Sequence, residues 1–253
     1  MRRWLLPLLA ILVVLGIWEL YVLASGVSSL VLPSPIDVVR ALFNDRGALW
    51  HNFKPTAAEI CLGLVLGAAV ALCVAVALRF SGLVRDALYP SLVASQAIPI
   101  PILAPLLVVW LGFGLLPKLI MIALVSFFPI VVTTLSALAA VDPDLIKLMR
   151  TFDAGRLQTF WRVELPSALP GLFAGAKLAA VFSVLAAILA EQAGASSGLG
   201  ELLTITIGNL ETAEAFATVF VLAAFAILLF ALLTLVERRA LPWIHTQRDT
   251  QTR

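Results

Sequence analysis

Six long apolar segments, separated by shorter polar ones, dominate the hydrophobic pattern of this chain. A helix that crosses a bilayer needs about 20 mostly apolar residues, whereas the strands of a membrane barrel alternate over about 10. We therefore expect an all-α integral membrane protein with a single transmembrane domain over residues 1–253. The six transmembrane helices are placed at about 4–24, 57–78, 88–111, 118–140, 171–191 and 215–236.

Composition supports a membrane protein over a soluble one. Hydrophobic residues make up 62% of the chain and charged residues 13%, whereas soluble domains are about half apolar and a quarter charged. The first apolar run is longer than the roughly 7–15 residues of a signal peptide, so we expect an uncleaved first helix. Neither His51 nor His245 has a second ligand at metal-binding spacing, and no metal site is predicted.

Lys and Arg are distributed unevenly between the two sets of connecting segments. Thirteen of the 17 lie at the termini, within 79–87 and 141–170, or at Lys177, and the 192–214 segment has none. Because cytoplasmic segments carry the excess of basic residues, we expect both termini and the 141–170 segment to face the cytoplasm.

The 141–170 segment interrupts the apolar pattern with charged residues and prolines. Asp142 is a suitable helix cap, Pro143 suits a first turn, and Ala154-Gly155 permits a break between two short amphipathic helices. Apolar residues recur at helical spacing on both sides of that break: Leu145, Leu148, Met149, Phe152, Leu157, Phe160 and Trp161.

Pro166 and Pro170 are expected to stop the second of these helices before the fifth span. The helix pair would then either rest on the membrane interface or dock into a groove of a cytoplasmic partner. From the residues alone the two alternatives are equally favoured.

The stretch QTFWRVELPSALPG (158–171) is similar to the second half of the coupling motif of binding-protein-dependent ABC importer permeases. That motif runs Glu-Ala-Ala, three residues, Gly, nine residues, Ile, one residue, Leu-Pro. Leu165-Pro166 matches its end, Asp153 stands at the glycine, and Lys147-Leu148-Met149 stands in place of Glu-Ala-Ala. Four more stretches, at 32–35, 98–114, 127–138 and 190–202, resemble the permeases of the nitrate, sulfonate and taurine group.

The resemblance implies partners that the chain itself does not contain. In that family two permease copies, here most simply a homodimer, dock two cytoplasmic ABC ATPase subunits, and an extracytoplasmic solute-binding protein delivers the substrate. The chain has no GxxxxGK[ST] phosphate loop, so we expect it to bind no cofactor, to be no enzyme, and to use ATP only through a partner. The implied setting is the lipid bilayer of a bacterial cytoplasmic (inner) membrane, with no role for nucleic acid. The implied ATPase-coupling residues are Asp153, Ala154, Gly155, Arg156, Gln158, Phe160, Trp161, Arg162, Leu165 and Pro166.

Polar groups and prolines inside spans are candidates for a substrate pathway. The prolines of the third span are expected to kink it. Gln96 could equally form a satisfied interhelical hydrogen bond, and Glu191 could be a gate, a contact with the binding protein, or a solvated helix end. Glu59 is expected to be solvated and Lys177 to extend back to the cytoplasm. The candidates are Gln96, Pro99, Pro101, Ser126, Thr133 and Glu191.

These patterns together predict the permease subunit of an ATP-driven importer for a small organic solute or oxyanion. The substrate candidates are a sulfonate, nitrate or taurine, or a nitrogen heterocycle such as a thiamine pyrimidine precursor or riboflavin. The scarcity of fixed charges among the pathway candidates favours an uncharged or planar solute. The alternative is a secondary transporter without an ATPase, which would show two related halves with broken helices.

Overall fold

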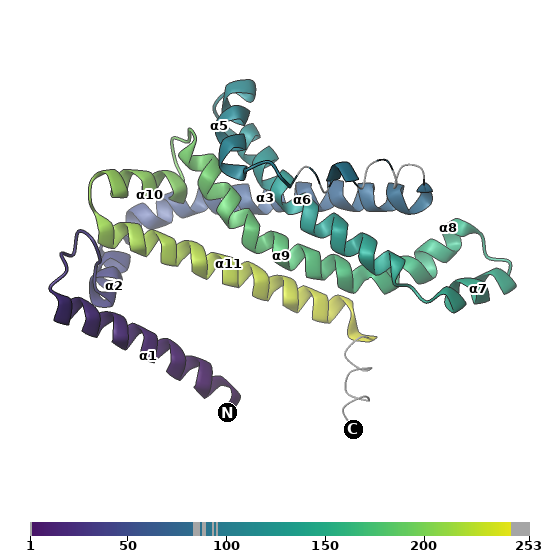
Figure 1. Cartoon of the computed structure of the whole chain (residues 1–253), viewed down its shortest axis with the longest axis horizontal. Helices are drawn as coiled ribbons and strands as arrows, with labels where there is room; N and C mark the ends of the chain where they lie inside the picture. The colour runs from purple at the N-terminus through teal and green to yellow at the C-terminus, as the bar shows by residue number, and fades with distance from the viewer. Residues whose placement is uncertain (1, 83–86, 88–89, 93, 95, 244–253) are drawn as a thin grey trace.

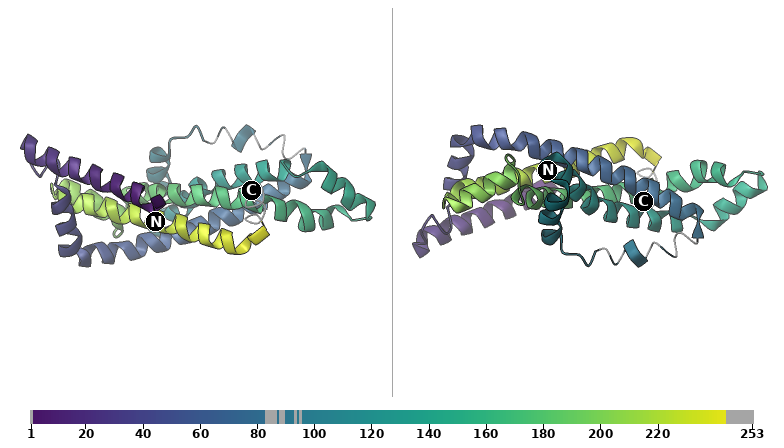
Figure 2. Two further views of the ribbon diagram at one scale, coloured as in Figure 1. Left: turned by 90° about the horizontal axis from the view of Figure 1, so that it is seen from below. Right: turned by 90° about the horizontal axis from the view of Figure 1, so that it is seen from above.

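The computed structural model describes residues 2–82, 87, 90–92, 94 and 96–243, and every regular element in this part of the chain is a helix (Figure 1). The long helices run side by side to form an elongated bundle (Figures 1 and 2). The elements are α1 (Arg2–Ser25), α2 (Pro35–Asn44), α3 (Arg46–Phe80), α5 (Ile100–Leu111), α6 (Leu115–Ala139), α7 (Pro143–Thr151), α8 (Arg156–Thr159), a π-helix (Phe160–Glu164), α9 (Leu165–Gln192), α10 (Leu199–Gly208) and α11 (Thr212–Ala240).

Within the described residues, four helices are long and apolar enough to cross a membrane. They contain or nearly coincide with the second, fourth, fifth and sixth predicted spans, and α1 covers the first. These four helical segments are Arg46–Phe80, Leu115–Ala139, Arg156–Gln192 and Thr212–Ala240.

The third predicted span, 88–111, is wrong as a single helix. Gln96 lies in a turn, and α5 begins only at Ile100, with Pro99 as its N-cap and Pro101 in its first turn. A proline lacks an N–H and disfavours helical backbone at the residue before it, so Pro99 and Pro101 start this helix instead of kinking it. Part of the predicted span lies outside the described residues.

Helix α6 is the central element of the bundle, because both α3 and α9 pack along it. Glycines make this close approach possible. A Cβ on Gly67 of α3 would lie 2.7 Å from the Ala123 carbonyl oxygen, and one on Gly171 of α9 would lie 2.8 Å from the Thr133 carbonyl oxygen. Gly63 and Gly67, four positions apart on one face of α3, therefore pack against α6 of the same chain.

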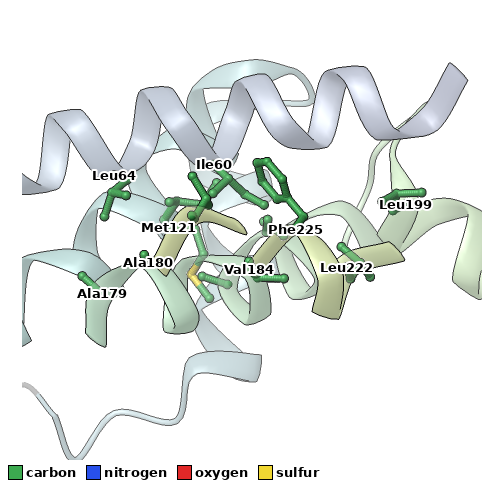
Figure 3. Close-up of a cluster of buried hydrophobic side chains, with 14 of the residues drawn as sticks. Ile60, Leu64, Met121, Ala179, Ala180, Val184, Leu199, Leu222 and Phe225 are labelled. Carbon is green, nitrogen blue, oxygen red and sulfur yellow. The ribbon is translucent and has the colours of Figure 1, made fainter. Parts of the chain in front are cut away.

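The core lies where α3, α6, α9 and α11 meet (Figure 3). Ile60, Met121 and Ala180 are fully buried there, and Phe225 of α11 packs edge-on against Phe53 of α3. Outside this core, many large apolar side chains point away from the chain, above all on α1, which lies at the margin of the bundle. Such a surface suits lipid and not water.

Two elements shape the end of the bundle opposite α7 and α8, which we call the outer end for its place in the arrangement proposed below (Figure 1). In α2, the Ser34 hydroxyl accepts from the Asp37 N–H and Pro35 fills the first turn, so the stretch at 32–35 forms the start of this helix. Helix α10 was not predicted, because the 192–214 segment reads as a connection. It packs on α9 and α11.

Candidate functional site

The 141–164 hairpin, formed by α7, a tight turn, α8 and the π-helix, projects beyond the ends of α3 and α11 (Figures 1 and 2). It begins as predicted: the Asp142 carboxylate accepts a hydrogen bond from the Asp144 N–H, and Pro143 occupies the first turn of α7. The side chains of α7 are exposed or half-buried.

The turn between α7 and α8 depends on Asp153, which stands at the glycine of the coupling motif. Its φ of +55° lies in the left-handed region that glycine adopts most readily and that Asp tolerates better than most residues. The Ala154 N–H then donates to the Met149 carbonyl and closes the turn. The break between the helices spans residues 152–155 and so includes Ala154-Gly155, as predicted. Its left-handed residue is Asp153, whereas Gly155 has φ −66°, which any residue can adopt.

The second half of the hairpin runs into the membrane span without a stop. The helical segment Arg156–Gln192 is continuous, with a π-helical turn at Phe160–Glu164. The prediction that Pro166 and Pro170 end this helix is therefore wrong. Pro166 lies in the first turn of α9, directly after the π-turn. The wider π-turn leaves room for the proline ring, so the helical path continues through it.

Phe160 and Trp161 do not share one exposed face. Phe160 is 1% exposed and packs 5.1 Å from Phe80 of α3, whereas Trp161 is 60% exposed. The resemblance implies an ATPase-coupling role for both residues, but only Trp161 is exposed, since the π-turn directs neighbouring side chains to different sides. Phe160 anchors the hairpin to the bundle, and Trp161 is left for an external contact. The remaining exposed apolar side chains of the hairpin are Leu145, Leu148, Phe152 and Leu157.

An ion pair that the sequence did not reveal joins this π-turn to α3. Two guanidinium nitrogens of Arg79, Nε and Nη2, donate to the two Glu164 carboxylate oxygens at 2.7 Å and 2.6 Å. The Glu164 side chain is 8% exposed. Such two-point pairing fixes relative orientation as well as distance. The C-terminal end of α3 and the start of α9 are thus held together.

A groove of about 700 Å³ lies beside α6, between α5 and α9. Gln96 and Thr133 are its polar side chains, and the lining is otherwise apolar. The Thr133 hydroxyl donates to the Pro129 carbonyl at 2.8 Å and keeps lone pairs free to accept. The main aromatic lining residues are Phe127, Phe128 and Phe182.

The other pathway candidates lie elsewhere. Pro99 and Pro101 flank the groove-lining residues Ile98 and Ile100 without lining it themselves. Ser126 is fully buried and faces Gly67 of α3. The structure thus brings Gln96 and Thr133 to one surface and separates them from the remaining four candidates.

Glu191 is the centre of a buried network at the outer end, and the alternative of a solvated helix end is wrong. It is 1% exposed. One carboxylate oxygen accepts from the Thr56 hydroxyl at 2.6 Å, and the other accepts from the Gly200 N–H at 2.5 Å. The Thr56 oxygen in turn accepts from the Leu199 N–H at 2.8 Å. The carboxylate therefore caps α10 and ties it to α3 and α9.

Two more charged side chains have partners on other helices. Glu59 is 4% exposed and pairs with Lys118 at 2.6 Å, although the sequence predicted a solvated carboxylate. Lys177 pairs at 2.7 Å with Glu237, near the C-terminal end of α11, a partner that the sequence did not indicate. In both cases a partner on another helix replaces water, which a single apolar segment cannot reveal.

The chain is similar to a family of membrane transport proteins and to several named permeases. Residues 63–243 match the family described as binding-protein-dependent transport system inner membrane component. A probable ABC transporter permease of Haemophilus influenzae is 34% identical, over 90% of this chain and 93% of its own. The formylaminopyrimidine transport permease ThiX of Halalkalibacterium halodurans is also 34% identical, over 94% and 95%. The putative aliphatic sulfonates permease SsuC of Bacillus subtilis is 30% identical, over 95% and 88%.

Solved structures agree on the fold. The chain superposes on an inward-facing form of the MetNI methionine ABC transporter with a TM-score of 0.64 and 20% identity. The match covers 82% of this chain and 98% of that one. The chain therefore belongs to the binding-protein-dependent transport system inner membrane component family, and it is a multi-pass ABC transporter permease.

Proposed function

We propose that this chain is the transmembrane subunit of an ATP-driven importer and that a separate ATPase binds its 141–164 hairpin. The observation that carries the proposal is the construction of the hairpin. Its turn exposes Phe152 and its π-turn exposes Trp161, while its base is continuous with α9 and paired to α3 through Arg79 and Glu164. A displacement of the hairpin by the ATPase would therefore be transmitted to both α3 and α9.

The proposed membrane arrangement has six spans, with both termini and the hairpin in the cytoplasm. The distribution of Lys and Arg supports it, as does the position of the hairpin toward the same end of the bundle as the end of α11 (Figure 1). Helix α5 has 12 residues, about 18 Å of rise, roughly half of what a bilayer core requires. The third span must therefore include residues that precede Pro99.

We further propose that the groove of Gln96 and Thr133 is half of the substrate pathway and that a second copy of the chain supplies the other half. Polar groups in an otherwise apolar membrane surface mark such paths. The outer end, with α2 and α10, would receive a solute-binding protein in the space outside a bacterial inner membrane.

For the substrate we favour an uncharged, planar solute such as a nitrogen heterocycle. The groove supports this choice because it is lined by aromatic rings and by one amide and one hydroxyl. A sulfonate would require fixed donors or positive charge to replace its hydration. The named relatives carry both classes, ThiX a formylaminopyrimidine and SsuC aliphatic sulfonates.

The deciding experiment is purification of the chain in mild detergent from its native membranes, followed by identification of what accompanies it. We expect a P-loop ATPase in a one-to-one ratio and a binding protein whose ligands can then be screened. Trp161→Ala is expected to lose the ATPase, while the exposed Phe220→Ala on α11 keeps it. A chain that emerges alone, and drives uptake into vesicles from an ion gradient without ATP, would support the secondary transporter instead.

A further inference from the structure

A small polar pocket of about 140 Å³ lies between the end of α3 and the hairpin. It belongs to neither the membrane groove nor the exposed apolar tip. Three arginines and one glutamate surround it: Arg79, Arg150, Arg156 and Glu164. We refer to these four residues and the space between them as the arginine pocket.

The charges of the arginine pocket do not balance. Both Glu164 oxygens are taken by Arg79, so this carboxylate neutralises one guanidinium. Among the described residues no carboxylate forms an ion pair with Arg150 or Arg156. The pocket therefore carries two positive charges for which the described part of the chain supplies no anion.

The geometry of the pocket suits a carboxylate. A cavity of about 140 Å³ has room for such a group. Arg guanidinium groups present a planar fork of donors that matches the two oxygens of a carboxylate.

The surroundings favour a protein over a lipid headgroup as the source of that anion. The pocket is built on the hairpin, which projects beyond the ends of α3 and α11 (Figure 2). The same hairpin exposes Leu148, Phe152 and Trp161. Protein interfaces are enriched in aromatic residues and in Arg, and the hairpin presents both together.

We propose that the arginine pocket receives the carboxylate of an Asp or Glu side chain from the ATPase subunit. This inference rests on the proposed function, since it names the chemistry by which the same partner is recognised. Arg150 and Arg156 hold the incoming carboxylate, and Arg79 keeps the pocket in shape through Glu164. The apolar tip supplies contact area, and the carboxylate sets the register of docking.

Lysine substitution with carbodiimide coupling tests the chemistry of the partner directly. A carbodiimide joins a lysine amine to a carboxylate as an amide and does not couple a guanidinium. In a Lys147→Arg background, Arg150→Lys and Arg156→Lys in the complex with the co-purified ATPase should each give a cross-link to one acidic residue of that subunit. Arg162→Lys is the matched control, because Arg162 is exposed on the π-turn but does not line the pocket.

Charge reversal tests the contribution to binding. Arg150→Glu and Arg156→Glu should each weaken ATPase binding about tenfold or more, and Arg162→Glu about twofold or less. If the unaltered chain binds an ATPase while the reversals do not weaken it and no cross-link forms, the pocket is not the docking site although the importer proposal stands. Loss of co-purified anionic phospholipid instead of ATPase would assign the pocket to lipid. If no ATPase binds the unaltered chain, the proposed function itself fails.

Discussion

The two ends of this permease handle their polar groups in opposite ways. At the outer end, Glu191, Thr56 and the first N–H groups of α10 satisfy one another, and Glu59 is paired with Lys118. At the hairpin end, Arg150 and Arg156 lie exposed on a projecting hairpin. The outer end is closed by the chain's own groups, whereas the hairpin presents groups for which we propose a partner on another chain.

The difference separates the stability of the folded chain from the stability of its complex with a partner. A buried charge must be paired, so loss of its partner costs folding free energy. An exposed charge costs little when removed, so its loss is detected only in a complex. Substitutions at the outer end should therefore unfold the chain, and substitutions on the hairpin should leave it folded but without its ATPase.

The largest expected effect comes from breaking the buried pair at the outer end. Lys118→Ala leaves the Glu59 carboxylate buried without its cation and should lower the free energy of unfolding by about 3–5 kcal/mol. Thermal unfolding of the detergent-purified chain measures the loss. The double variant Glu59→Gln/Lys118→Met should recover most of it. An unchanged melting temperature for Lys118→Ala would mean that water reaches this pair.

The next effect contrasts two adjacent residues of the π-turn. Phe160→Ala removes a buried ring and should cost about 3 kcal/mol or more of stability. Trp161→Ala removes an exposed ring and should change stability by about 0.5 kcal/mol or less while weakening ATPase binding. Unfolding and pull-down measurements on both variants distinguish the anchoring role of Phe160 from the ATPase contact of Trp161. Equal losses of stability would contradict the distinction.

A smaller effect is expected at the glycine that borders Glu191. Gly198 has φ +133°, and a Cβ there would overlap the Glu191 carboxylate. Gly198→Ala should therefore cost about 1–3 kcal/mol and should speed hydrogen exchange in α10. Gly155→Ala is the control, because Gly155 has φ −66° and no atom within 4 Å of an added Cβ. Equal exchange in the two variants would contradict a fixed outer end.

Sequence reasoning succeeded where one segment determines the result. The apolar lengths of α3, α6, α9 and α11, and the cap at Asp142, depend on neighbouring residues alone. It failed where distant residues meet. The burial of Glu191 depends on Thr56, 135 positions away, and the pairing of Glu164 depends on Arg79, 85 positions away.

The same reasoning explains the errors at proline. Pro166 and Pro170 were expected to stop a helix, as proline does when its surroundings supply no alternative. Here the π-turn at Phe160–Glu164 precedes Pro166, and the tertiary anchor at Phe160 keeps the segment helical. At the third span the opposite holds, because Pro99 and Pro101 come first and set where α5 begins.

The smallest expected change in stability is at the Arg79–Glu164 pair, which is intermediate between the buried pairs of the outer end and the exposed charges of the hairpin. Arg79 is 38% exposed and Glu164 is 8% exposed, so their pair is half open to solvent. A double-mutant cycle of Arg79→Met and Glu164→Gln should give a coupling free energy of about 1 kcal/mol, between the values for exposed and buried pairs.

The effect of the same substitutions on transport should be larger than their effect on folding. Without the Arg79–Glu164 pair, the Phe80–Phe160 contact still joins α3 to the π-turn, but the charged two-point link is lost, so a movement of the hairpin reaches α3 less directly. Arg79→Met should therefore lower the number of solute molecules moved per ATP hydrolysed in proteoliposomes, a ratio that does not depend on how many complexes form. Exchanging the two residues, Arg79→Glu with Glu164→Arg, restores the attraction and should restore coupling. A ratio unchanged in Arg79→Met would mean that the motion is transmitted without this pair.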